Sequence, residues 1–180
     1  ISFGGGGTIL GKTDNWMKSI VVEKDDQGNN FQFISNEPRV DENYIDLLGI
    51  EIIAGRNFSA NMPGDAEKSV IINEAYDGVM GWDDPVGKIM DNENQVKVIG
   101  LVKDFHFDAL NNPIEPLTFK MLNDQQSYLF VKTDPKNMTT IQKKWEGIYD
   151  DEPFEYQFLN QHMADLYQKE EKEMATFTYL

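Results

Sequence analysis

The first candidate for chemistry in this 180-residue chain is a glycine-rich stretch near its start. The run Gly6-Gly7-Thr8-Ile9-Leu10-Gly11-Lys12-Thr13 satisfies the G-x-x-x-x-G-K-[ST] pattern, in which backbone N–H groups cradle the phosphates of a nucleotide. That chemistry needs a buried strand before the loop and a helix after it. Only Ile1-Ser2-Phe3 precedes the glycines, and no long alternation of strands and helices follows. The sequence therefore favours a flexible arm over residues 1–15, and we expect no ATP binding.

A second candidate is the pair Asp104 and His106, which follows the strongest predicted strand. Alternation along a strand places both side chains on one face, where a carboxylate beside an imidazole suits general-base catalysis or half of a metal site. The only other histidine is His162. We expect a structural pair in which Asp104 accepts the imidazole N–H of His106, so that His106→Ala lowers stability by about 0.5–1.5 kcal/mol. A small hydrolase remains an alternative, and it would need a third polar group in a concave pocket.

The remaining carboxylates and tryptophans have ordinary explanations. Runs of acidic residues are expected to be solvated at turns or on an outer helical face: Asp83-Asp84, Asp150-Asp151-Glu152 and Glu170-Glu171. The stretch Asp91–Asn94 lacks the glycine and the spacing of a calcium loop. Core packing is expected of Trp16, Trp82 and Trp145. The sequence therefore assigns no catalytic, cofactor-binding or metal-ligating residue, and we expect no cofactor and no enzyme activity.

Composition narrows the class of protein. Lys and Arg number 16 against 31 Asp and Glu, and the formal net charge of -15 repels nucleic-acid phosphates. The absence of cysteine removes disulfides and thiolate chemistry. No stretch approaches the roughly 20 apolar residues of a membrane helix. The chain begins at Ile1 and ends in the charge-free run Met174–Leu180, so we expect both ends to be cuts within a longer protein.

Apolar periodicity and capping residues predict the secondary structure. Strands are expected at 20–22, 31–34, 50–53, 70–72, 96–102, 117–121, 128–131 and 154–158. Helices are expected at 42–48, 73–81, 138–148 and from 160 onward. Strand, helix and strand therefore occur in order over 31–53 and again over 128–159.

Two such units side by side make an α+β, split βαβ lobe of the ferredoxin-like, porter type. We expect 31–53 and 128–159 to share one sheet. Residues 1–57 and 123–180 would form this porter-like lobe, and residues 58–122 would form an inserted, smaller β-rich lobe.

Six segments resemble, in the same order, the sequence patterns of MacB-like periplasmic core domains of FtsX/MacB-type ABC transporter permeases. They are Val40–Ile50 and Ala54–Ser59 ("Y-h-x-x-L-G-h…h-x-G-R-x-F"), Val70–Ala75 ("VIINEA"), Gly81–Lys88 ("G-W-x-D-P-I-G-K"), Val98–Phe107 ("VIGVVKDFHF", as in Bacteroidetes) and Pro153–Leu159. The resemblance extends from about Val40 to Tyr167 and leaves the first 15 residues unmatched.

The resemblance implies a non-catalytic domain held between two membrane helices on the periplasmic, extracytoplasmic face of the inner membrane. It implies that ATP-driven motion of those helices is coupled to substrate export (efflux) or to envelope-protein partners. The implied partners are a cytoplasmic ABC ATPase, a second permease copy in a dimer, and a periplasmic adaptor protein. A secreted or periplasmic ligand- or protein-binding module unrelated to transport is the alternative.

Overall fold

The computed structural model describes residues 1–11, 16–24, 30–91, 95–108, 112–122, 127–149 and 151–165. The chain divides into two compact units: Phe3–Phe130, and Ile1–Ser2 together with Val131–Leu180. Within the described ranges no helix has both the length and the apolar character needed to cross a bilayer.

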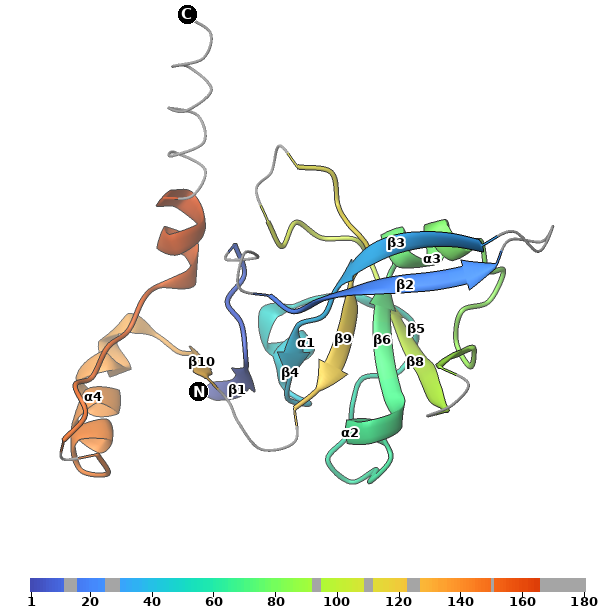
Figure 1. Ribbon diagram of the computed structural model, residues 1–180. Helices are drawn as coiled ribbons and strands as arrows, with labels where there is room; N and C mark the ends of the chain where they lie inside the picture. The colour runs from blue at the N-terminus through green and yellow to red at the C-terminus, as the bar shows by residue number, and fades with distance from the viewer. Residues whose placement is uncertain are drawn as a thin grey trace, which may run out of the picture. The chain divides into compact units, whose positions relative to one another are not determined.

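The unit Phe3–Phe130 is built on a mixed β-sheet (Figure 1). Its strand order is β10-β1-β4-β9-β6-β8-β5, and β7 pairs with β8 at the side of this path. The strands are β1 (Ser2–Gly6), β4 (Arg39–Val40), β5 (Ile52–Gly55), β6 (Ser69–Asn73), β7 (Ile89–Asp91), β8 (Val96–Val102), β9 (Thr118–Met121) and β10 (Tyr128–Lys132). The β4–β9 and β6–β8 pairs are parallel, whereas β5–β8, β6–β9 and β7–β8 are antiparallel.

Three short helices accompany this sheet: α1 (Tyr44–Leu48), α2 (Asp65–Lys68) and α3 (Glu74–Met80). Asn73 caps α3, because its Oδ1 atom accepts a hydrogen bond from the backbone N–H of Tyr76 at 3.0 Å. Gly49 ends α1 and Gly81 ends α3, each in the left-handed conformation that glycine adopts without steric cost. Both helix ends fall where the sequence predicts them.

Apolar side chains pack on both faces of the sheet. Ile71, Ile99 and Phe119 belong to a buried cluster that includes Tyr44 and Ile45 of α1. A second buried cluster contains Val70, Ile72, Val98, Leu101 and, from α3, Tyr76. Because burial of one such side chain stabilises the fold by about 1.5–3 kcal/mol, these clusters hold the sheet between α1 on one face and α3 on the other.

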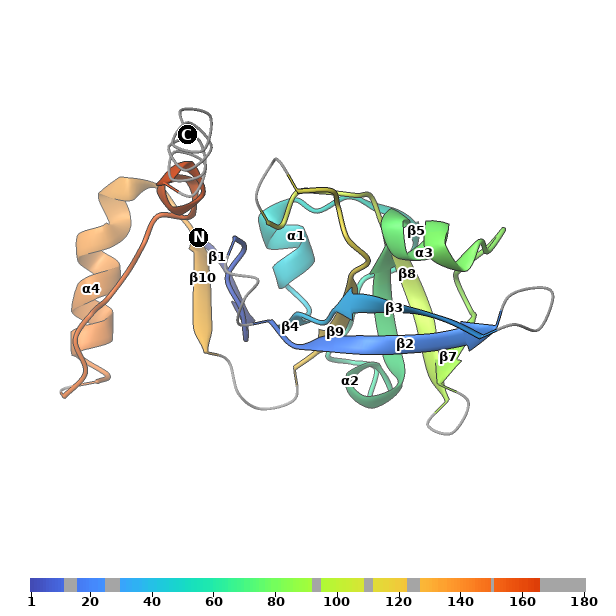
Figure 2. The same cartoon turned by 45° about the horizontal axis from the view of Figure 1, so that its top comes forward.

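A hairpin of β2 (Lys18–Lys24) and β3 (Asn30–Asn36) forms a separate two-stranded sheet that crosses β6 and β8 (Figures 1 and 2). Its register pairs Ile20 with Ile34. The inner face contributes Val21 and Phe33 to the second cluster, and the Phe33 ring meets Tyr76 edge-on at 5.1 Å. The hairpin therefore covers the same face of the sheet as α3.

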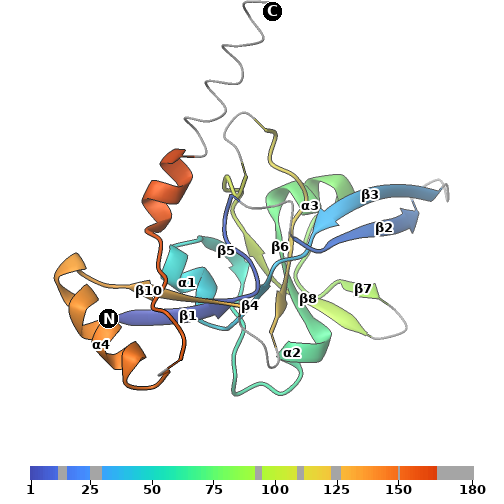
Figure 3. The same ribbon diagram turned by 60° about the vertical axis from the view of Figure 1, so that its left-hand side comes forward.

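The second unit contains the 3-10 turn η2 (Pro135–Asn137) and helix α4 (Met138–Glu146), which follow β10 along the chain (Figure 3). Residues 159–165 are also helical. The Trp145 ring packs against Tyr149 at 4.5 Å and against Phe154 at 6.2 Å. Aromatic contacts therefore join α4 to the extended segment that follows it.

The predicted α+β class is confirmed, and a mixed main sheet with a small separate two-stranded sheet is consistent with a split βαβ domain carrying an inserted β element. The sheet contains β4, β5 and β10 from the two segments expected to share it. It also contains β6, β7, β8 and β9, which lie within 58–122 and pair with β4, β5 and one another. The predicted boundaries at 57 and 122 therefore do not coincide with the division between the two units.

Two local predictions are wrong. Residues 1–15 were expected to be a flexible arm, but Ser2–Gly6 is strand β1, and the glycines suit it because a Cβ atom on Gly6 would lie only 3.1 Å from the Tyr44 ring. Residues 154–158 were expected to be a strand, but they form neither a strand nor a helix, and Tyr156 and Phe158 are exposed.

Candidate functional site

Backbone N–H groups of the glycine-rich segment form hydrogen bonds within the protein. The Gly5 N–H donates to the buried carboxylate of Asp41 at 2.6 Å, and the Gly7 N–H donates to the carbonyl of Arg39 at 2.8 Å. Lys12 and Thr13 of the phosphate-loop pattern lie outside the described residues. Strand β2 begins at Lys18, seven residues after Gly11. These glycine N–H groups therefore anchor β1 rather than face an open site.

Asp104 lies at the N-terminus of α3. Its hydrogen-bond partners there do not include His106, the partner that strand alternation predicted. Its Oδ1 atom accepts hydrogen bonds from the Asn73 side chain at 2.9 Å and from the Ala75 N–H at 3.0 Å. The Asp104 N–H donates in turn to the Glu74 carboxylate at 2.9 Å. The carboxylate therefore ties the end of β8 to the start of α3, where the helix dipole favours negative charge.

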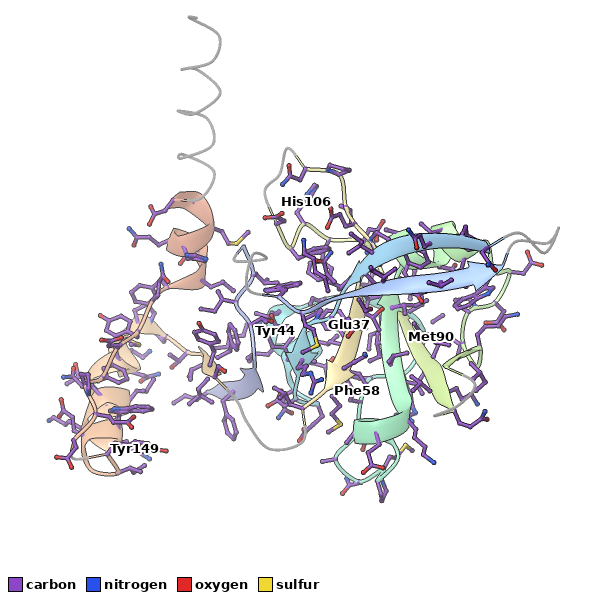
Figure 4. The ribbon with its side chains drawn as sticks, in the orientation of Figure 1. Glu37, Tyr44, Phe58, Met90, His106 and Tyr149 are labelled. Carbon is purple, nitrogen blue, oxygen red and sulfur yellow. The ribbon has the colours of Figure 1, made fainter. Side chains whose placement is uncertain are left out.

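His106 does not form the predicted pair with Asp104. Strand β8 ends at Val102, so the strict alternation on which the pairing depended stops two residues before Asp104. His106 is exposed and lies on the loop beyond the end of β8 (Figure 4). The Asp104 carboxylate is hydrogen-bonded to Asn73 and Ala75 and not to His106. Asp104 and His106 therefore do not form an acid–base couple.

Asn73 is the buried centre of this polar network. Its Oδ1 atom accepts from the Leu117 N–H at 2.9 Å as well as from Tyr76, and its Nδ2 atom donates to Asp104 and to the Glu115 carbonyl. Four hydrogen bonds use the full capacity of the amide, so β6, β8, α3 and the segment before β9 are joined at one point.

A second polar cluster forms around the buried Asp65. Arg56 approaches it with both terminal nitrogens, Nη1 at 2.6 Å and Nη2 at 2.8 Å. The Ser59 N–H and the Ser69 hydroxyl donate to the same carboxylate at 2.9 and 3.1 Å. The Arg56 hydrogen bonds lower the pKa of Asp65 below its ordinary value against the opposing effect of burial, and the same pairing raises the pKa of Arg56.

Beside this ion pair lies an open groove of about 830 Å³. Its walls come from the end of β5, the loop before α2, the start of β6, the turn before β7, and β8. The charged residues among its lining are Arg56, Asp65, Lys68 and Lys97, and apolar lining includes Met62 and Val86. Sequence patterns do not predict this groove, because its residues come from four separate segments of ordinary composition.

The other residues singled out in the sequence lie as follows. Trp16 is buried and stacks on Phe107 at 5.3 Å, Trp82 packs against Tyr76, and Trp145 is half-buried beside Tyr149. Among the described acidic runs, Asp83, Asp84, Asp151 and Glu152 are exposed, while Glu170-Glu171 lies outside the described residues. Within those ranges no group of three or more His, Asp or Glu side chains could hold a metal ion.

No family model matches this chain, and no curated protein matches it. Several solved structures are similar to this chain. The periplasmic region of MacB from Actinobacillus actinomycetemcomitans is 13% identical, with a TM-score of 0.57 over 92% of this chain and 75% of that one. The extracellular domain of the noncanonic ABC-type transporter YknZ from Gram-positive bacteria is 14% identical, with a TM-score of 0.57 over 83% and 74%.

A domain of a protein described as a permease, from Porphyromonas gingivalis, is 14% identical, with a TM-score of 0.51 over 91% of this chain and 82% of that one. At these identities the likeness concerns the fold. The chain has the fold of periplasmic and extracellular domains of ABC-type transporters, which confirms the fold that the sequence resemblance implied.

Proposed function

We propose that this chain is the extracytoplasmic domain of an ABC transporter permease. The observation that supports this most is the shared fold over 92% of the chain with the periplasmic region of MacB. The six sequence segments that resemble MacB-like core domains point to the same class of protein independently of the coordinates.

The role proposed for the domain is mechanical and not catalytic. Several of the groups singled out for chemistry form hydrogen bonds within the fold: Asp104 accepts from the Ala75 N–H at the start of α3, and the N–H groups of Gly5 and Gly7 donate to Asp41 and Arg39. In this proposal a cytoplasmic ATPase closes on ATP, membrane helices carry the motion outward, and the domain passes it to substrate or to envelope proteins. A permease dimer and a periplasmic adaptor protein are the further proposed partners.

The location can be tested in whole cells by labelling the parent protein, because this chain contains no cysteine. Glu67 is exposed and Val70 is buried three residues away, which provides a matched pair. With any other cysteines of the parent protein replaced, a membrane-impermeant maleimide should label Glu67→Cys in intact cells. It should label Val70→Cys only after denaturation.

Labelling of Glu67→Cys only after cell lysis would contradict an extracytoplasmic location. A carbonate wash of the membranes distinguishes a permease domain from the alternative, a secreted or periplasmic binding module. Retention of the labelled protein in the membrane supports a permease domain, whereas its release supports a secreted or periplasmic binding module.

A further inference from the structure

The groove beside Arg56 is lined by two lysines as well as by the Arg56–Asp65 ion pair. Arg56 and Asp65 compensate each other through their paired hydrogen bonds. Lys68 and Lys97 are exposed, and in the part of the chain that the structure describes neither of them makes an ion pair. Two ammonium groups that have no ion-pair partner among the described residues therefore line one concavity.

This local charge is opposite to that of the whole chain, whose formal net charge is -15. Three of the described lysines form ion pairs: Lys103 with Glu51, Lys120 with Glu37 and Lys136 with Asp134. A concave, low-dielectric surface with charges of one sign focuses their field and raises the local concentration of ions of the opposite sign. The groove is thus suited to an anion.

The same groove also exposes apolar surface. Met62 is 48% exposed, Pro63 beside it is exposed as well, and Val86 lines the groove from the turn before β7. A volume of about 830 Å³ lies within the range of roughly 300–1,000 Å³ typical of sites for organic ligands and is far larger than a simple inorganic ion requires. The lining therefore favours an anion that has an apolar body.

The wall of the groove from Arg56 to Ser69 is held in place by the protein's own hydrogen bonds. Four hydrogen bonds to Asp65, from Arg56, Ser59 and Ser69, connect β5, the loop before α2 and β6. A ligand would not have to order these segments on binding, and such preorganisation lowers the free-energy cost of binding.

We propose that this groove binds an amphiphilic organic anion, with a carboxylate or phosphate group held between Lys68 and Lys97 and an apolar body against Met62 and Val86. The proposal rests on the lining alone and does not depend on the transporter role. Lysine ammonium groups recognise either head group as point charges, so the two kinds of head group must be separated by experiment.

The test is an NMR titration of the chain with three probes of equal alkyl length below their micellar concentrations: decanoate, decyl phosphate and decyltrimethylammonium. The two anions are expected to shift the backbone amide signals of Gly55, Gly87 and Lys97, and the cation is not. Affinity for the anions should fall as salt is raised, because screening weakens the attraction. Binding of only one anion would support the proposal and identify the head group.

A matched pair of variants separates the groove from overall charge. Lys68→Ala/Lys97→Ala should weaken anion binding by about tenfold, since each exposed charge pair contributes modestly. Lys143→Ala/Lys144→Ala removes the same charge from α4 and should leave the affinity unchanged. Equal binding of the cationic probe, equal weakening by both double variants, or signal changes at the exposed hairpin residues Ile20 and Val22 would each overturn the proposal.

Discussion

Asp65 shows how a single side chain organises the loop around it. Its side chain is only 3% exposed, and it accepts hydrogen bonds from Arg56, Ser59 and Ser69. A carboxylate held in this way is stabilised in its charged form, and the Arg56 hydrogen bonds are the largest cause of its lowered pKa. Protonation of Asp65 therefore weakens the cluster.

The pH dependence of stability follows from the direction of that shift. Because the folded-state pKa of Asp65 lies below the unfolded value, its stabilising contribution is present above the unfolded pKa and is lost as pH falls through the folded pKa. Asp65→Asn should lower the free energy of unfolding by about 1–3 kcal/mol at neutral pH and by much less near pH 2, as measured by urea denaturation.

Glu51→Gln is the matched control for this measurement. Its carboxylate is 63% exposed and lies 3.4 Å from Lys103, and such surface pairs contribute about 0–1 kcal/mol. An equal loss of stability for Asp65→Asn at both pH values would contradict the assignment.

Asp104 and His106 show why the sequence could not predict these polar contacts. Alternation is a local rule, and it predicted a pair only on the assumption that the strand continued to His106. The actual partners of Asp104 are Asn73 and Ala75, which lie 31 and 29 residues away. No local pattern records a hydrogen bond over that separation, and the Arg56–Asp65 pair was missed because charged residues are common in loops.

Among the elements, β1 is the strand whose packing depends on glycine, which has no side chain. A Cβ atom on Gly6 would lie 3.1 Å from Tyr44 Cε2 and 3.3 Å from Phe130 Cε2, and the two rings already pack edge to face at 5.2 Å. Tyr44 is fully buried, so its ring has little room to move. The glycine run, which suggests disorder in the sequence, is what lets this strand fit.

We expect Gly6→Ala to destabilise the protein by about 1–3 kcal/mol, because the added methyl group overpacks this contact. Gly7→Ala is the matched control. Its Cβ atom would meet Arg39 at 3.7 Å or more, which is an ordinary contact, and the change should be neutral or slightly stabilising. Thermal melts of both variants measure the difference, and similar shifts for the two would argue against close packing at Gly6.

Elements whose ends depend on local chemistry were predicted well. The ends of α1 and α3 at Gly49 and Gly81 and the cap at Asn73 could be predicted from single residues. The failed strand at 154–158 had the right alternation, but a strand also needs a partner, and alternation says nothing about partners.

At the scale of the whole molecule, the sequence predicted the α+β class and the related fold, but not the order of the strands in the main sheet. Most segments of the resemblance lie within Phe3–Phe130, so that unit was identified by its order of motifs. Two strand pairs, β5 with β8 and β4 with β9, cross the predicted boundary at residue 57.

The proposed coupling can be measured on the parent permease with its ATPase in nanodiscs. A spin label at Glu67→Cys should show a dipolar signal between two copies, and the distance distribution should differ between nucleotide-free and ATP-bound states. The ADP-bound complex is the control, because its ATPase holds a nucleotide but is not closed. A distribution that ATP does not change would contradict mechanical coupling, and the absence of a dipolar signal would contradict the dimer.

The contacts between the base of the β2–β3 hairpin and the segment around β9 also bear on how the chain folds. Asn36 bonds to Glu115, Ser35 to Thr118 and Lys120 to Glu37, over separations of 79 to 83 residues. Closing a loop of that length costs entropy before any contact forms, and folding slows as contacts become less local. The β2–β3 contacts are local along the chain, but during synthesis β4 cannot pair with β9 until the ribosome has made β9. The exposed edge of β4 must therefore stay unpaired on that side while some 80 further residues emerge.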